Sequence, residues 1–198
     1  MAFVRTEDRR VRKTKNLLHG ALAALIHEKP YDDIVVKEIL ARADVGRSTF
    51  YSHFRDKDEL LDSGIRDLLR PGQADLRPRA ARVADHVLRF SPPLFEHIGR
   101  YRAAPIPIVR ARMQVVHDRL GREVAALVAH DLAQCSPPHA GRQERERHIP
   151  AELLAEHVAS TFVRVLNWWL GSPTPIPASE ANELFRSLVL PTLARVVG

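Results

Sequence analysis

The sequence is poor in cysteine and in aromatic residues. Its 198 residues include a single cysteine, Cys135, and only 6% aromatic side chains. One cysteine cannot form a disulfide within the chain, which is typical of a protein from a reducing compartment. No resolving thiol or activating base is identifiable beside Cys135, and we interpret it as a small residue without chemistry of its own.

Long hydrophobic runs are also missing. No apolar stretch is long enough to span a bilayer, and the N-terminal residues 1–8 lack the apolar segment of a secretory signal. We therefore expect a cytoplasmic protein that does not contact a membrane.

The usual catalytic and metal-binding motifs are absent as well. The chain has no glycine-rich phosphate loop, no nucleophile elbow and no HExxH sequence. No two of its ten histidines are three or four residues apart, and no acidic or cysteine cluster joins them. We expect no enzymatic activity, no cofactor and no metal site.

What the chain does contain is hydrophobic and basic. Hydrophobic residues make up 45% of it and charged residues 27%, enough for a core and a hydrated surface. The net charge of +6 favours a polyanionic partner. The charge is not concentrated, however, because residues 1–70 hold 14 Lys/Arg against 12 Asp/Glu. Charge alone does not identify the segment that binds such a partner.

Apolar residues recur at helical spacing along almost the whole chain, and no convincing alternating strand is present. The sequence therefore predicts an all-α fold. In the first third, the predicted helices run from Thr6 to before Pro30, over 36–42, over 47–54, and from Asp56, where Glu59 resembles the end of a capping box.

The segment Arg70-Pro71-Gly72 predicts a boundary between two parts of the chain. Beyond it we expect helices near 80–90, 93–102 and 108–134, and a loop over 136–148. A long helix is predicted from Pro150 to Gly171, and a last one from Ser179 that is kinked or ended by Pro191.

The third predicted helix has one apolar and one polar face. Phe50 and Phe54 lie one turn apart and are expected to point inward, with Ser48 and Ser52 opposite them. Arg47, Thr49, Tyr51 and His53 complete a polar, cationic surface. Two short helices joined by a tight turn, with such a surface on the second, are typical of a helix-turn-helix that enters the major groove.

The segment DIVVKEILARADVGRSTFYSHFRDKDELL, residues 33–61, resembles the DNA-binding signature of the TetR family. Its most diagnostic part is TFYSHF at 49–54, followed by Lys57 and Leu60-Leu61. The resemblance implies a helix-turn-helix DNA-binding domain over 1–55, a connecting helix over 56–70, and a helical effector-binding and dimerisation domain over 71–198.

The resemblance also implies roles for individual residues. Bases would be approached by Arg47, Ser48 and Thr49, with Lys37 as a further reader, and phosphates would be held by Tyr51, His53 and Lys57. A weaker expectation places Arg9, Arg10, Arg12 and Lys13 beside backbone phosphates.

Three residues depart from the family pattern. Val35 stands where a threonine is common, so a phosphate-contacting hydroxyl is lost and Asp33 becomes the nearest possible cap. Asp44 replaces the usual turn glycine and is one of the few other residues that tolerate a left-handed backbone. Gly46 replaces a serine cap and serves acceptably. None of the three breaks the fold.

The body carries no comparable signature. Candidate residues of an effector pocket are Phe90, Phe95, His97, Tyr101, His117, Arg164 and Trp168. The last two helices resemble the dimer-forming pair of the family, with Phe162, Val165, Trp169, Leu184 and Leu188 as candidate interface residues. Trp169 is more simply a core or interface anchor than a ligand contact, whereas Trp168 suits either role.

The sequence therefore predicts a homodimeric repressor that binds a palindromic double-stranded DNA operator and is released by a small-molecule effector. The alternative is a helical interaction protein that shares the fold but lacks specific operator binding, which only Val35 favours. Activation in place of repression is also open from the sequence.

Overall fold

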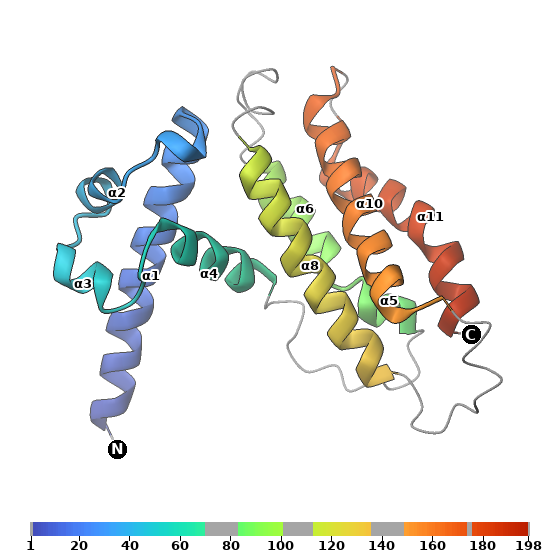
Figure 1. The fold of residues 1–198 in the computed structure, drawn as a ribbon, viewed down its shortest axis with the longest axis horizontal. Coiled ribbons are helices and arrows are strands. Elements are labelled where there is room, and N and C mark those ends of the chain that lie inside the picture. The colour runs from blue at the N-terminus through green and yellow to red at the C-terminus, as the bar shows by residue number, and fades with distance from the viewer. Residues whose placement is uncertain (1, 70–82, 101–112, 136–148, 174–175, 198) are drawn as a thin grey trace.

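The computed structural model describes residues 2–69, 83–100, 113–135, 149–173 and 176–197, and every regular element among them is a helix (Figure 1). The predicted all-α fold is confirmed. The N-terminal helices form a head, which comprises α1 (Ala2–Glu28), the short 3-10 helix η1 (Tyr31–Asp33), α2 (Val36–Ala43) and α3 (Arg47–Tyr51). Helix α4 (Lys57–Leu69) leads from the head to the body.

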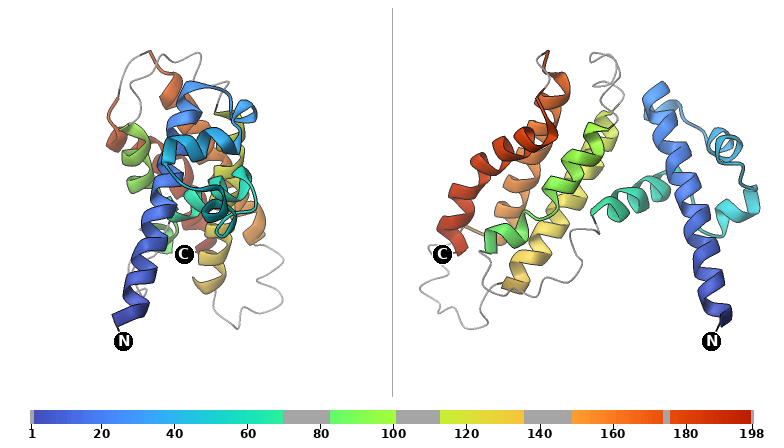
Figure 2. Two further views of the ribbon diagram at one scale, coloured as in Figure 1. Left: turned by 90° about the vertical axis from the view of Figure 1, so that its left-hand side faces the viewer. Right: turned by 180° about the vertical axis from the view of Figure 1, so that it is seen from behind.

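The body contains α5 (Val83–Val87), α6 (Ser91–Gly99), α8 (Gln114–Cys135), α10 (Ala151–Gly171) and α11 (Ala178–Val197). Helix α10 packs between α8 and α11, while α6 packs against α11 (Figure 2). Among the described residues, no helix is long and apolar enough to cross a membrane.

Helix α1 differs from its predicted start. It begins at Ala2, four residues before Thr6, because no glycine or proline precedes Thr6 to stop the helix. It ends at Glu28, as predicted, since Pro30 disfavours a helical backbone at the residue before it.

The turn between α2 and α3 depends on Asp44. Its φ is 51°, the only positive φ of a non-glycine residue in the described part of the chain. The amide of Asp44 donates to the carbonyl oxygen of Leu40, and the left-handed conformation turns the amide of Val45 onto the same oxygen at 3.2 Å, which ends α2. The predicted tolerance of Asp44 for this conformation is confirmed.

The predicted cap at the start of α2 is wrong. Asp33 makes no cap, and the Glu38 carboxylate accepts a hydrogen bond from the amide of Val35 at 3.1 Å instead. Lys29 holds that carboxylate from the other side, with Nζ 2.6 Å from Oε2. This contact is the half of a capping box that does not need a threonine, while the amide of Glu38 donates to the carbonyl oxygen of Val35 at 3.0 Å.

Helix α3 is shorter than predicted, ending at Tyr51, although the amides of His53 and Phe54 still donate to the carbonyl oxygen of Phe50. At the start of α4, Asp56 accepts from the amide of Glu59 at 2.8 Å, as its capping role requires. The Glu59 carboxylate reaches the amide of Arg55 at 2.7 Å, one residue earlier than in a capping box.

The body helices also differ from the predicted boundaries. Helix α5 ends at Val87, and a turn over 88–90 precedes α6, whose first turn holds Pro92 and Pro93. Helix α10 starts one residue after Pro150. Pro191 does not end α11, which continues to Val197, because Pro191 and the residue four positions before it both face solvent. The predicted boundary at 70–72 lies outside the described residues.

Aromatic rings fill the centre of the body. Phe162 is fully buried, and its ring centroid lies 5.4 Å from that of Phe90, 5.0 Å from Phe95 and 5.4 Å from Phe185. Trp169 packs edge-on against Phe95 at 5.6 Å. Its indole N–H donates to the carbonyl oxygen of Ile176 at 2.9 Å and so joins the end of α10 to the start of α11.

This aromatic core contains four residues with predicted roles. Phe90 and Phe95, predicted for an effector pocket, are 1% and 0% exposed and pack against Phe162 in this core. Phe162 and Trp169 are equally buried and cannot form a surface for a second subunit. Helical spacing marks all four as apolar positions, but it does not distinguish a core from an interface.

Phe162→Ala should lower the free energy of unfolding by about 3–5 kcal/mol, because it removes the ring at the centre of this cluster and leaves a cavity. Urea unfolding followed by circular dichroism measures the change. The control is Glu183→Ala on the exposed face of α11, expected to change stability by less than about 0.5 kcal/mol. A loss below about 1 kcal/mol in Phe162→Ala would contradict the assigned core.

Candidate nucleic-acid interface

Two phenylalanines fix the orientation of α3. Phe50 is 0% exposed and Phe54 is 3% exposed, with ring centroids 5.9 Å apart. Phe54 also lies near His19 of α1, with centroids 6.0 Å apart. Because both rings pack into the head, the remaining side chains of α3 turn outward. The inward orientation predicted for the two phenylalanines is confirmed.

The outward face of α3 is polar. Arg47, Ser48, Thr49 and Tyr51 are all exposed, and none of them is an acidic residue. The Arg47 guanidinium carbon lies 5.7 Å from the centroid of the Tyr51 ring, a cation–π arrangement that holds both side chains on this face. Such a face presents hydrogen-bond donors and one positive charge to a groove.

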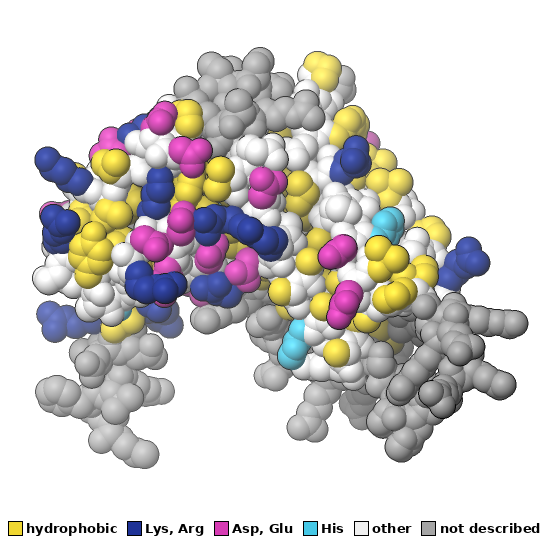
Figure 3. Space-filling model, viewed as in Figure 1, with side chains coloured by type: hydrophobic (Ala, Val, Ile, Leu, Met, Phe, Trp, Pro, Cys, Tyr) yellow, Lys and Arg dark blue, Asp and Glu magenta, His cyan; other side chains and the backbone are white. Residues whose placement is uncertain are grey.

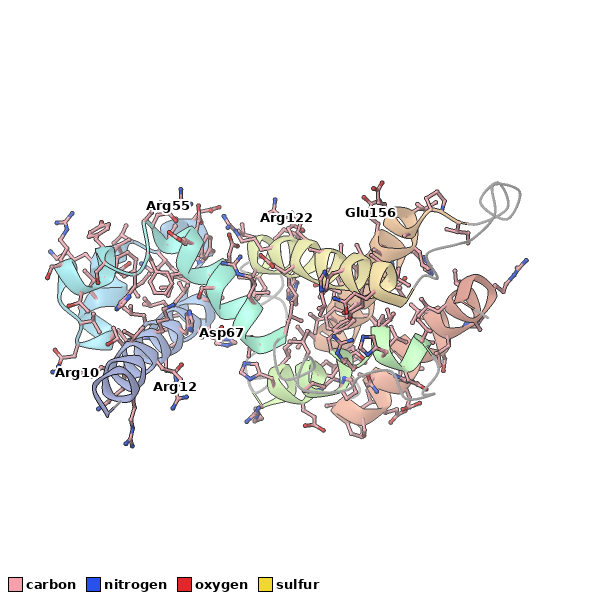
Figure 4. All side chains as sticks on the ribbon, turned by 90° about the horizontal axis from the view of Figure 1, so that it is seen from below. Arg10, Arg12, Arg55, Asp67, Arg122 and Glu156 are labelled. Atoms are coloured by element: carbon pink, nitrogen blue, oxygen red, sulfur yellow. The ribbon has the colours of Figure 1, made fainter. Side chains whose placement is uncertain are left out.

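Other predicted contact residues surround α3. Lys37 is exposed in the first turn of α2, and His53 is half-buried after α3. Arg10 and Arg12 extend from α1 into solvent (Figure 4). Arg9 and Lys13 are also exposed on α1.

Lys57 occupies a different environment from the one predicted. Its ammonium donates to the carbonyl oxygens of Tyr31, Asp32 and Ile34 at 2.9, 3.1 and 2.8 Å. It also lies 4.6 Å from the centroid of the Tyr31 ring. Since three donors meet three carbonyl acceptors, this side chain joins η1 to α4.

Charged side chains connect the head to the body. Figure 3 shows acidic and basic side chains interleaved over α4 where it approaches α8. Arg119 of α8 contacts two carboxylates of α4, with Nη2 2.9 Å from Asp58 and Nη1 2.9 Å from Asp62. A second ion pair joins Arg66 of α4 to Glu123 of α8 at 2.9 Å.

Tyr31 extends this network into the head. Its hydroxyl donates to the Asp58 carboxylate at 2.6 Å. Burial, together with that hydrogen bond, raises the pKa of the Tyr31 hydroxyl well above its ordinary value. The hydroxyl therefore stays protonated and keeps donating, so one carboxylate links η1 of the head to α8 of the body.

An open groove of about 1450 Å³ lies on the body, along α8, α10 and α11. Figure 4 shows Arg122 of α8 and Glu156 of α10 extending on one side of the body, where both line the groove. Three predicted residues with exposed hydrophobic side chains also line it: Trp168, Leu184 and Leu188, which are 50%, 40% and 59% exposed.

Several of the remaining residues predicted for the body line this groove. Arg164 and Trp168, predicted for an effector pocket, lie in the groove beside Leu184 and Leu188. Val165 lines the same groove but is only 6% exposed, so it offers little surface to a second subunit.

A smaller cavity of about 400 Å³ lies between the head and the body. Its walls come from α1, α4, α6, α8 and α10. Of the predicted effector residues, His97 and His117 line it, and His117 lines the groove as well. Tyr101 lies outside the described residues.

The segment that carries this interface matches known regulators. The family model described as bacterial regulatory proteins, tetR family, matches residues 18–63, which extend from within α1 into α4. The chain belongs to the TetR family.

Curated relatives support this membership. The TetR-family chain is 30% identical over 144 residues to an uncharacterized HTH-type transcriptional regulator of Mycobacterium tuberculosis, covering 67% of this chain and 66% of that protein. It is 27% identical over 187 residues to the uncharacterized HTH-type transcriptional regulator YxbF of Bacillus subtilis. That match covers 91% of this chain and 46% of YxbF, so the chain spans about half of that relative.

Solved structures share the TetR-type fold. A TetR transcriptional regulator from Streptococcus agalactiae matches with a TM-score of 0.55 and 23% identity, over 94% of this chain and 98% of that chain. RolR, solved in complex with resorcinol, matches with a TM-score of 0.52 and 18% identity, over 93% of this chain and 89% of that chain.

The sequence reasoning missed Arg119 and the role of Lys57. Asp58 and Asp62 lie four residues apart, so they share one face of α4, and this spacing could have indicated a cationic partner. Nothing in the sequence identified that partner, which is 57 residues from Asp62 along the chain.

Arg119→Met should lower the free energy of unfolding by about 1 kcal/mol, because it removes two partly exposed ion pairs while keeping most of the aliphatic stem. Urea unfolding at low salt and at high salt measures the effect, which should shrink as salt screens the charges. Arg122→Met, exposed on the same helix, serves as the control. Equal losses in the two variants would contradict the assigned link.

Proposed function

We propose that this TetR-family regulator is a homodimeric repressor that binds a palindromic operator and is released from it by a small-molecule effector. The observation that carries the proposal is the outward face of α3, held in place by buried Phe50 and Phe54. A short helix with an uncharged or cationic outer face fits the major groove, where acidic residues would be repelled by phosphates.

The proposed contact residues fall into two groups, those that contact bases and those that contact phosphates. Arg47 has the planar fork that matches O6 and N7 of guanine, and the hydroxyls of Ser48 and Thr49 reach base edges or phosphates. Lys37, at the start of α2, is a further base reader. Tyr51 and His53 hold backbone phosphates and set the depth of α3 in the groove. The Lys57 side chain does not contact DNA in this proposal, because its ammonium donates to three carbonyl oxygens of the head.

Dimerisation through α10 and α11 explains the exposed hydrophobic side chains of the groove. Leu184 and Leu188 lie one turn apart on α11, and Trp168 lies on α10 beside them. A second copy placed on the same surface about a two-fold axis would cover all three side chains. Two heads related by that axis would bind two half-sites whose centres lie about 10 base pairs apart.

Effector release adds a conformational step. RolR, which shares the fold, was solved with resorcinol bound, and we infer that a small organic molecule acts on this chain as well. Such an effector would have to bind a conformation whose two heads do not match the half-site spacing more tightly than it binds the DNA-binding conformation. The ion pairs between α8 and α4 would transmit the change to the head.

Arg47→Ala should relax base preference at one position of each half-site, at a cost of about 1–3 kcal/mol for the preferred base. Gel-shift titrations on the preferred operator and on single-base variants measure this. Tyr51→Phe keeps the ring and should weaken binding to all sequences equally. Unchanged operator selection by Arg47→Ala would contradict the base-reading role of Arg47.

Leu188→Asp should shift the protein from dimer to monomer at micromolar concentration, since it would bury one carboxylate from each subunit in the proposed interface. Sedimentation velocity measures the shift. Leu153→Asp is the matched control, because Leu153 is a similarly exposed leucine that does not line the groove. A stable Leu188→Asp dimer would contradict the proposed interface.

A further inference from the structure

The cavity between the head and the body has a mostly apolar wall. Apolar side chains from five helices line it, including Leu22 and Ile26 of α1, Ile65 of α4, Leu94 of α6, Leu120 of α8 and Leu166 of α10. Its volume of about 400 Å³ lies within the range of small-molecule sites. A ligand inside it would contact head and body helices at the same time.

The polar part of the wall consists chiefly of imidazoles. His19, His27, His97 and His117 line the cavity together with Asn16 and Asp67. No lysine or arginine is among the described residues of the wall. An anionic ligand would therefore lose its hydration without gaining a permanent cationic partner.

Burial keeps these imidazoles uncharged. Desolvation lowers the pKa of His19, His27, His97 and His117, although Asp67 opposes the shift at His19. A neutral imidazole has one donor and one acceptor nitrogen, so it can donate to a carbonyl group and can either donate to or accept from a hydroxyl group. Asp67, the one carboxylate among the described residues of the wall, lies 3.9 Å from Nδ1 of His19.

His117 provides a second, independent observation. Its side chain is only 2% exposed, and neither ring nitrogen makes a hydrogen bond within the described residues. The Asn167 side chain lies close enough to oppose the lowering of the His117 pKa but not in hydrogen-bond geometry. Nε2 of His19 is buried without a partner among the described residues as well. Buried polar atoms of this kind are usually satisfied, which points to a ligand group that completes them.

We propose that this cavity is the effector site, and that it takes an uncharged, largely apolar molecule with a hydroxyl or carbonyl group that hydrogen-bonds to His117 or His19. The effector role rests on the proposed function. The ligand class rests on the wall alone: its apolar side chains, the ring nitrogens of His117 and Nε2 of His19 that lack partners among the described residues, and no cation among its described residues.

The position of His117 links this site to the head. It lies two residues before Arg119, whose guanidinium holds Asp58 and Asp62 of α4. On α4, Gly64 approaches His19 so closely that an added Cβ would lie 3.4 Å from Cδ2 of its ring. A ligand that engages both histidines would therefore act on the α1–α4 and α8–α4 contacts together.

The ligand class can be tested with three probes that share one ring system: 2-naphthol, 2-methylnaphthalene and 2-naphthoate. Titration calorimetry at pH 7.5 on the full chain without DNA should give the tightest binding for 2-naphthol, about tenfold tighter than for either of the others. Equal or tighter binding of 2-naphthoate, or no binding of 2-naphthol, would overturn the proposal.

Substitutions test which histidines hydrogen-bond to the probe and whether the probe binds in the cavity or in the groove. His19→Phe/His117→Phe keeps two flat rings and should abolish the tenfold advantage of 2-naphthol over 2-methylnaphthalene. His157→Phe, on an exposed face of α10, should retain it. Ser160→Arg alters the groove and not the cavity, so it should leave 2-naphthol binding unchanged. An advantage that survives the double substitution, or binding lost in Ser160→Arg, would overturn the assignment.

These measurements do not involve DNA, so they separate the two proposals. A chain without operator binding that still discriminates the probes would contradict the proposed function and support the ligand class. A chain that binds a specific operator but shows no preference for 2-naphthol would support the proposed function and contradict the ligand class.

Discussion

Burial of Phe50 and Phe54 in the head is the constraint on which the rest of the interface depends. Helix α3 has five residues, too few to be stable alone, so tertiary packing must supply its conformation and its orientation. Once the two rings are inside, the order of residues along the helix places Arg47, Ser48, Thr49 and Tyr51 outside. The polar outward face of α3 is thus a consequence of the hydrophobic core beneath it.

Charged residues of the head serve two separate purposes. Arg47 and Lys37 are exposed and available to a partner, whereas Lys57 is used internally on three carbonyl oxygens. Asp58 joins Tyr31 and Arg119, and this places a carboxylate at the junction of the head and the body. In the proposed complex, affinity for DNA would therefore depend on the cations that remain exposed and not on the net charge of the head.

Local structure was predictable where neighbouring residues determine it. The inward phenylalanines, the left-handed Asp44 and the capping role of Asp56 follow from spacing and from backbone preferences, and the structure bears them out. Partners distant in sequence were not predictable. Periodicity identifies Phe162 and Trp169 as apolar positions, but only the packing of α6 and α11 around them shows that they are interior. Arg119 likewise finds its carboxylates only when α8 and α4 come together.

Selection of DNA fragments from a random library by the purified protein, followed by sequencing, tests whether this regulator has a specific operator. One palindrome with half-sites about 10 base pairs apart should be enriched, and its binding should weaken steeply as salt is raised. Recovery of fragments without a shared motif, at a yield no higher than for non-specific DNA, would contradict it.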